Sequence, residues 1–319
     1  MSELKEQLDS LRNLLQDSAF LKLNAWAKKE KGVWSKLWGA FDNLEDTIRA
    51  IDEFLNEKNP SRLQIYGVLQ ALTIQQDAVK HLEQALGIEV TDLNAIATLE
   101  IVRNIRDETV GHPTNTVHNQ EKSSYRDGTI TYTSLHPESL STNFEYIVWS
   151  SGGSEIKSVN LIDLIEQQKK ALTQIITGAA KQLNGKETTH MQKFKHDSLE
   201  QLFNQSGYYI QKLWPFERSR EYSKLCLDAL KKDYRKFKNG IKARYGHTVF
   251  DQEAFLPGLL IEVQKVDKIF PKLNLMIMID EGVDKLDLEV YVEALDNALK
   301  ELRVMARETD EKFGYEPEE

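Results

Sequence analysis

Apolar residues recur at steps of three and four along most of the chain, which is the spacing of one face of an α-helix. Leu4, Leu8, Leu11, Leu14 and Leu15 show this pattern near the start, and it returns after each interruption by glycine or proline. In the first half of the chain, the spacing predicts helices over residues 3–27, 33–57, 62–86, 93–110 and 160–183.

The pattern changes in the stretch that precedes the last of these helices. Residues 114–142 are rich in Thr, Ser, Asn and Gly, and no helical spacing runs through them. Short β-prone runs lie at residues 129–133, 144–149 and 155–159, with a Ser-Ser-Gly-Gly turn between the last two. We therefore expect a β-hairpin or a three-stranded insertion at about residues 125–159.

A second group of helices is predicted beyond Asn184-Gly185-Lys186, where we place a domain boundary. These helices span residues 190–214, 217–245, 251–270 and 283–312, and residues 273–279 fit either a strand or a buried helix. The expected fold class is mainly α. Residues 1–185 form a helical domain with a β appendage, and residues 186–319 form an all-helical domain.

Composition narrows the class of protein. The 319 residues carry a net charge of −9, which argues against a wholly basic nucleic-acid coat protein. The single cysteine, Cys226, excludes an internal disulfide and a cysteine-based zinc site. No apolar run is long enough to span a bilayer, and the first residues lack the apolar core of a secretory signal. We expect a cytoplasmic protein without membrane contact.

Charge is unevenly distributed in the second half. Residues 189–247 hold 13 Lys and Arg against 6 Asp and Glu, whereas residues 248–319 hold 8 against 18. Aromatic residues lie among the basic ones; this mixture suits single-stranded RNA, but aromatics at helical spacing also form cores. The acidic segment could also cover the basic one until a trigger releases it. The candidate RNA contacts are Lys231, Lys232, Arg235, Lys236, Lys238, Lys242 and Arg244.

The segment Val102–Pro113 carries the residues best suited to chemistry. Arg103 and Arg106 are neighbours on a predicted helix, and a glycine lets the chain leave that helix just before His112. Arginine offers a fork of donors that matches phosphate oxygens, and histidine can carry a proton near neutral pH. Together these groups suffice for metal-independent RNA cleavage, in which the 2′-hydroxyl attacks the adjacent phosphorus.

Arg106 and Asp107, followed after four residues by His112, resemble the signature of the HEPN superfamily. That signature is an Arg, a polar residue, three to five residues of any kind and a His. The resemblance implies a helical bundle that forms a homodimer, with the two motifs facing each other in one composite site. It also implies that Arg106 stabilises phosphate, that His112 acts as acid or base and that Asp107 orients them.

The same resemblance implies a biological setting. Many HEPN proteins are metal-independent ribonucleases of toxin–antitoxin, abortive-infection and other antiphage systems. RNA is then the expected substrate, and an antitoxin or another defence-system protein is the expected partner. The resemblance covers at most residues 34–185, and residues 190–319 match no family in this way.

Further polar residues could support the site. Arg103 and Asn104 form a second Arg-polar pair, but eight residues lie between Arg103 and His112, which is too long for the signature, so Arg103 is interpreted as support. The helix predicted over residues 62–86 also has a polar side, which would face either the arginines or water. That side carries Gln70, Asp77 and His81.

Two functions from different classes remain open. One is the ribonuclease, which needs Arg106 and His112 exposed on one cleft. The alternative is a catalytically inert helical module that acts as an interaction partner, scaffold or regulator of another protein. The histidines lack the spacing of a metal site, and no phosphate loop or nucleophile elbow occurs, so we expect no metal and no cofactor.

Overall fold

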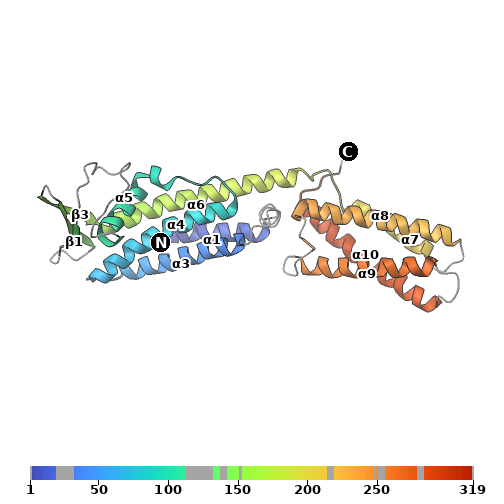
Figure 1. The fold of residues 1–319 in the computed structure, drawn as a ribbon. Helices are drawn as coiled ribbons and strands as arrows, with labels where there is room; N and C mark the ends of the chain where they lie inside the picture. Colours follow the sequence, from blue (N-terminus) through green and yellow to red (C-terminus); the bar gives the residue numbers. More distant parts are fainter. Residues whose placement is uncertain are drawn as a thin grey trace. The chain divides into compact units, whose positions relative to one another are not determined.

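The computed structural model describes residues 2–18, 32–111, 132–136, 142–150, 153–213, 219–246, 249–250, 256–278 and 284–317. The described chain is mainly helical with one small antiparallel sheet, as the apolar spacing predicts (Figure 1). It divides into two compact units, which we call the N-terminal unit (Met1–Asp17 with Lys31–Asn184) and the C-terminal unit (Ser18–Glu30 with Gly185–Glu319). None of the described helices is both long and apolar enough to cross a membrane.

Long helices that run alongside one another build the N-terminal unit (Figure 1). The predicted ranges of the second and third helices are confirmed to within two residues, because their apolar stripes are the buried faces. Ser61 begins the third helix in a capping box: its hydroxyl accepts from Gln64 N, and the Gln64 side chain accepts from Ser61 N. The helices before the sheet include α1 (Ser2–Asp17), α3 (Val33–Leu55) and α4 (Arg62–Leu86).

The helix predicted over residues 93–110 is divided into three parts. Leu93–Ala95 forms a 3₁₀ turn (η1), α5 spans Ala97–Arg106, and Asp107–Gly111 forms a π-helical turn (η2). Ile96 is extended, with φ −98° and ψ 101°, and this residue separates the 3₁₀ turn from α5. Asp92 caps the 3₁₀ turn instead of a long helix, and its side chain accepts from Asn94 N. The candidate motif lies at the end of a short helix.

Of the two expected forms, a hairpin or a three-stranded insertion, the structure has the three-stranded one, and its first strand extends two residues past the predicted range of 129–133. The strand order is β1-β2-β3, and both neighbouring pairs are antiparallel. Phe144, Tyr146 and Val148 alternate along β2 with more exposed residues and pack against apolar residues of α3, α4, α5 and α6. The sheet is thus anchored on the helices by one face. Its strands are β1 (Tyr132–Leu135), β2 (Asn143–Ser150) and β3 (Gly153–Asn160).

A helix break at Asn184-Gly185-Lys186 is not observed. Instead α6 (Leu161–Gln192) continues through these residues. Leu183, Glu187 and His190 are buried at steps of four and three, so the packed face of the helix extends past the glycine. Glycine inside a helix costs about 1 kcal/mol relative to alanine, and burial of this face outweighs that cost.

The C-terminal unit is all-helical in its described part. The single helix expected over residues 190–214 is replaced by the end of α6, a 3₁₀ turn (η3) and a short helix. The helix expected over residues 251–270 begins later and continues through Pro271 to Met278, so the ambiguous segment is helical as far as it is described. Its elements are η3 (Glu200–Phe203), α7 (Ser206–Leu213), α8 (Arg220–Tyr245), α9 (Pro257–Met278) and α10 (Lys285–Lys312).

Helices α8, α9 and α10 share one hydrophobic core. Phe237 of α8, Val266 of α9 and Leu302 of α10 are each fully buried in it. The acidic segment 248–319 therefore supplies a large part of the core of this unit. That role contradicts the idea of a detachable acidic cover over the basic residues.

Candidate functional site

Arg106 lies at the last position of α5, and its side chain faces α4. Its Nε donates a hydrogen bond to Gln70 Oε1 at 3.0 Å, and its Nη1 forms an ion pair with Asp107 Oδ1 at 2.7 Å. The side chain of Arg106 keeps 27% of its surface exposed. A guanidinium held at two of its nitrogens has a defined orientation and still reaches solvent.

Arg103 lies one turn earlier on α5 and contacts the same helix. Its Nε donates to Gln76 Oε1 at 2.6 Å, and its Nη2 pairs with Asp77 Oδ1 at 2.8 Å. The predicted polar side of α4 thus faces the arginines at Gln70 and Asp77. His81 and Asn104 are exposed, and neither side chain forms a hydrogen bond or ion pair with the two arginines, which bond instead to Gln70, Gln76, Asp77 and Asp107.

A buried network of glutamines, which was not predicted from the sequence, lies behind Arg103. Gln76 Nε2 donates to Gln168 Oε1 at 2.7 Å, while Gln168 Nε2 donates to Gln75 Oε1 at 3.1 Å and to the Leu72 carbonyl at 2.8 Å. All three glutamines are at most 2% exposed. A sequence signal existed, because Gln75 and Gln76 lie one turn from Leu72 on the apolar side of α4.

The network predicts a measurable stability effect. In a Gln168→Leu variant, Gln76 and Gln75 each lose a buried partner, and we expect unfolding to become easier by about 2–3 kcal/mol. The adjacent Gln167 is exposed, so Gln167→Leu is the matched control. Urea unfolding followed by circular dichroism measures both variants. Equal midpoints for the two would contradict the role of the network.

The π-helical turn after Arg106 is tied to the sheet by Glu108. The Tyr146 hydroxyl donates to Glu108 Oε2 at 2.6 Å, and Lys157 Nζ lies 3.1 Å from both carboxylate oxygens. The Thr133 hydroxyl donates to the Glu108 carbonyl. All three strands therefore hold the segment that leads toward His112. His112 itself lies outside the described residues.

The seven candidate RNA contacts on α8 separate into three groups. Lys231, Arg235, Lys238 and Lys242 line one groove against α9. Lys232 and Lys236 are exposed and do not line that groove. The remaining candidate, Arg244, is buried.

The assignment of Arg244 as an RNA contact is wrong, because its side chain is 0% exposed. It pairs with Asp197 at 3.4 Å and Asp310 at 3.7 Å, and its guanidinium carbon lies 4.6 Å and 5.7 Å from the ring centres of Phe194 and Phe313. Burial lowers the pKa of the Arg244 guanidinium, and the two aspartates act in the opposite direction. Arg244 is a structural cation of the C-terminal unit.

Several aromatic residues of the basic segment are also core residues. Tyr234, Phe237 and Tyr245 are at most 4% exposed, as the alternative interpretation of helical spacing predicts. Burial raises the pKa of Tyr245 to about 12. Tyr208 differs, because it is 51% exposed and lies under Lys212 Nζ at 5.2 Å.

Metal binding receives no geometric support from the described residues. Within them, no group of three His, Cys, Asp or Glu side chains is placed to hold a metal ion.

Comparisons of the chain with protein-family models, curated proteins and solved structures found no match. The function can therefore be inferred only from the chemistry and the geometry of the residues.

Proposed function

We propose that this protein is a metal-independent endoribonuclease of the HEPN type, with Arg106 and His112 as its catalytic residues. A base removes the proton of a ribose 2′-hydroxyl, and that oxygen attacks the adjacent phosphorus. The bond from phosphorus to the 5′-oxygen of the next nucleotide breaks, and that oxygen takes up a proton. The products are a 2′,3′-cyclic phosphate and a 5′-hydroxyl, so the substrate is RNA.

The observation that carries this proposal is the restrained guanidinium of Arg106. Gln70 and Asp107 hold its Nε and Nη1, while about a quarter of the side chain stays open to solvent. Donors that are oriented before the reaction stabilise developing charge on phosphate oxygens without a reorganisation cost. In this role Arg106 binds the phosphate, and Asp107 fixes its orientation.

A second support is the geometry of the segment between Arg106 and His112. Turns of π-helix are rare and often occur at functional sites. Here the turn Asp107–Gly111 is held through Glu108 by Tyr146 and Lys157 of the sheet. His112 follows this restrained turn directly in the sequence, which suits an acid or base whose position must be reproducible.

The HEPN resemblance extends the proposal to assembly and setting. In this proposal a homodimer brings two copies of Arg106 and His112 to one cleft. The enzyme then acts in antiphage defence or in a toxin–antitoxin pair, and a partner protein controls it.

An inert interaction module is the second candidate, and one observation favours it. Both arginines already have carboxylate partners, Asp77 for Arg103 and Asp107 for Arg106. Such pairs are ordinary surface ion pairs in many proteins and need no substrate. In that case the Arg106 cluster has a structural role, and the protein acts by binding a partner.

The test is RNA cleavage in the presence of EDTA. Purified full-length protein is incubated with total RNA beside a His112→Ala variant. Arg49→Ala, a change at a 70% exposed arginine of α3, controls for altered charge. We expect cleavage by the wild type and by Arg49→Ala. In His112→Ala the rate of cleavage should fall by about 10²–10⁴-fold. Equal cleavage by all three proteins, or none by the wild type together with harmless expression in cells, would favour the inert module.

A further inference from the structure

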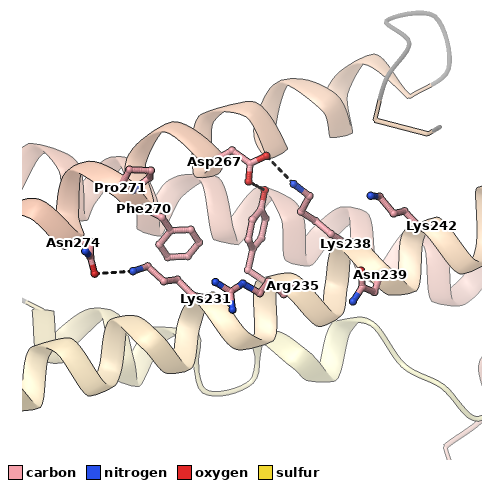
Figure 2. A pocket seen from close by; sticks show the side chains of 10 residues that line it. Lys231, Arg235, Lys238, Asn239, Lys242, Asp267, Phe270, Pro271 and Asn274 are labelled. Atoms are coloured by element: carbon pink, nitrogen blue, oxygen red, sulfur yellow. Dashed lines mark hydrogen bonds and ion pairs between the residues drawn. The ribbon is translucent and has the colours of Figure 1, made fainter. Parts of the chain in front are cut away.

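A basic groove lies within the C-terminal unit, between α8 and α9 (Figure 2). Its volume is about 530 Å³, which is within the range of ligand sites. Four cations line one wall at positions that share one face of α8, and α9 contributes a single carboxylate. The charged residues of the groove are Lys231, Arg235, Lys238, Lys242 and Asp267.

Two of the four cations are held by the opposite wall. Lys238 Nζ pairs with Asp267 Oδ2 at 2.8 Å, and Lys231 Nζ donates to Asn274 Oδ1 at 2.9 Å. Asp267 also accepts a hydrogen bond from the Tyr234 hydroxyl at 3.0 Å, which together with burial raises the pKa of that hydroxyl. The carboxylate is thus already engaged, and its repulsion of an anion is reduced.

The other two cations are available to a ligand. Within the described part of the chain, Arg235 and Lys242 form no hydrogen bond or ion pair through their side chains, and Figure 2 shows neither bonded to a lining residue. Lys242 Nζ lies 5.9 Å from the ring centre of Phe250, a contact that leaves its N–H donors free for an anion. Asn239 lies between them on α8 and is exposed. An open guanidinium, an open ammonium and an amide along one face form a set of donors suited to phosphate oxygens.

The length of the row indicates an extended ligand. Lys231 and Lys242 are eleven residues apart, which corresponds to about 16 Å along a helix. A single phosphate group cannot bridge that span, but a chain of phosphates can contact several of the cations at once.

The aromatic residues of the groove indicate how such a chain would be recognised. Tyr234 is 4% exposed and Phe270 is 6% exposed, so neither offers a face on which a base could stack. The half-buried ring of Phe250, near the end of the row, already lies against Lys238 Nζ at 5.5 Å and Lys242 Nζ at 5.9 Å. The groove therefore suits contacts to a phosphate backbone rather than to bases.

We propose that the α8–α9 groove binds the phosphodiester backbone of a single-stranded nucleic acid, independently of sequence. Arg235 and Lys242 provide the principal contacts, and Lys231 and Lys238 add to the positive field. Because the proposed contacts are to phosphates, we expect RNA and DNA of equal length to bind alike. Binding requires no cleavage, so this proposal is independent of the proposed ribonuclease activity.

The test measures affinity against salt for the full-length protein. The probes are 20-nucleotide oligo(U) and oligo(dT), each with a fluorescent label. The groove variant Arg235→Gln with Lys242→Gln is compared with the matched variant Lys232→Gln with Lys236→Gln, which removes the same charge from exposed positions of α8 outside the groove. All proteins carry His112→Ala so that cleavage does not interfere.

Loss of two phosphate contacts lowers the slope of log affinity against log salt by about 1.4, since each contact contributes about 0.7 on a single strand. We expect this change, and an affinity loss on the order of tenfold, for the groove variant alone. Equal salt slopes and equal affinities for the two double variants would overturn the proposal. Tighter binding of polyglutamate than of either oligonucleotide would also overturn it, in favour of an acidic peptide.

Discussion

Replacing Arg244 by methionine is expected to destabilise the C-terminal unit by about 3 kcal/mol or more. The guanidinium is completely buried between Phe194 and Phe313, and it donates to the Asp197 and Gly240 carbonyls. Its loss leaves the buried carboxylate of Asp310 without its nearby cation. Removing one partner of a buried ion pair costs far more than the pair itself contributes, because the remaining charge stays desolvated.

A matched control separates burial from charge. Arg303 pairs with Glu200 at 3.2 Å on the same unit, but its side chain is 46% exposed. Arg303→Met is therefore expected to cost less than about 1 kcal/mol. Thermal and urea unfolding of both variants give the comparison, with hydrogen exchange to localise the effect. A similar loss in both variants would show that Arg244 is not a structural cation.

Replacing Arg106 by alanine is expected to lower the rate of RNA cleavage by about 10²–10³-fold. The variant removes a guanidinium that is oriented by Gln70 and Asp107 and that, in the proposed function, binds the phosphate. Arg106→Lys keeps the charge but lacks the planar fork, so its rate should resemble that of the alanine variant more than the wild type. Gln70→Ala leaves the guanidinium in place and should cause a smaller loss.

The control for this series is Arg103→Ala, because Arg103 lies on the same helix and has equivalent polar partners. It should retain more activity than Arg106→Ala in single-turnover assays of matched protein samples. If Arg103→Ala loses as much as Arg106→Ala while both remain folded, the assignment of Arg106 as the phosphate-binding residue is wrong.

Much of the fold follows from hydrophobic spacing, and its exceptions have a physical cause. The range of α4 is predicted to the residue, because Ser61 and Gly87 mark its ends by local hydrogen bonding. Local signals fail at Gly185 and Pro271, where burial of residues on both sides keeps α6 and α9 helical. Tertiary packing therefore outweighs local propensity at these two positions.

The candidate site, like the fold, could be predicted from the sequence only in part. Helical geometry predicts the polar side of α4 but leaves open whether that side faces the arginines or water; in the structure Gln70 and Asp77 contact the arginines. Sequence spacing does not reveal Gln168, which reaches Gln76 from a helix 92 residues away in the chain. Nor does a count of charges distinguish Arg244 in the core from Arg235 in the groove.

The chemistry of the RNA ends that the wild-type protein releases in EDTA tests cleavage by Arg106 and His112 most directly. We expect 2′,3′-cyclic phosphates and 5′-hydroxyls, with no cleavage of a DNA strand of the same sequence. A dependence on added divalent metal, or products with 3′-hydroxyl and 5′-phosphate ends, would contradict cleavage by Arg106 and His112 through the 2′-hydroxyl.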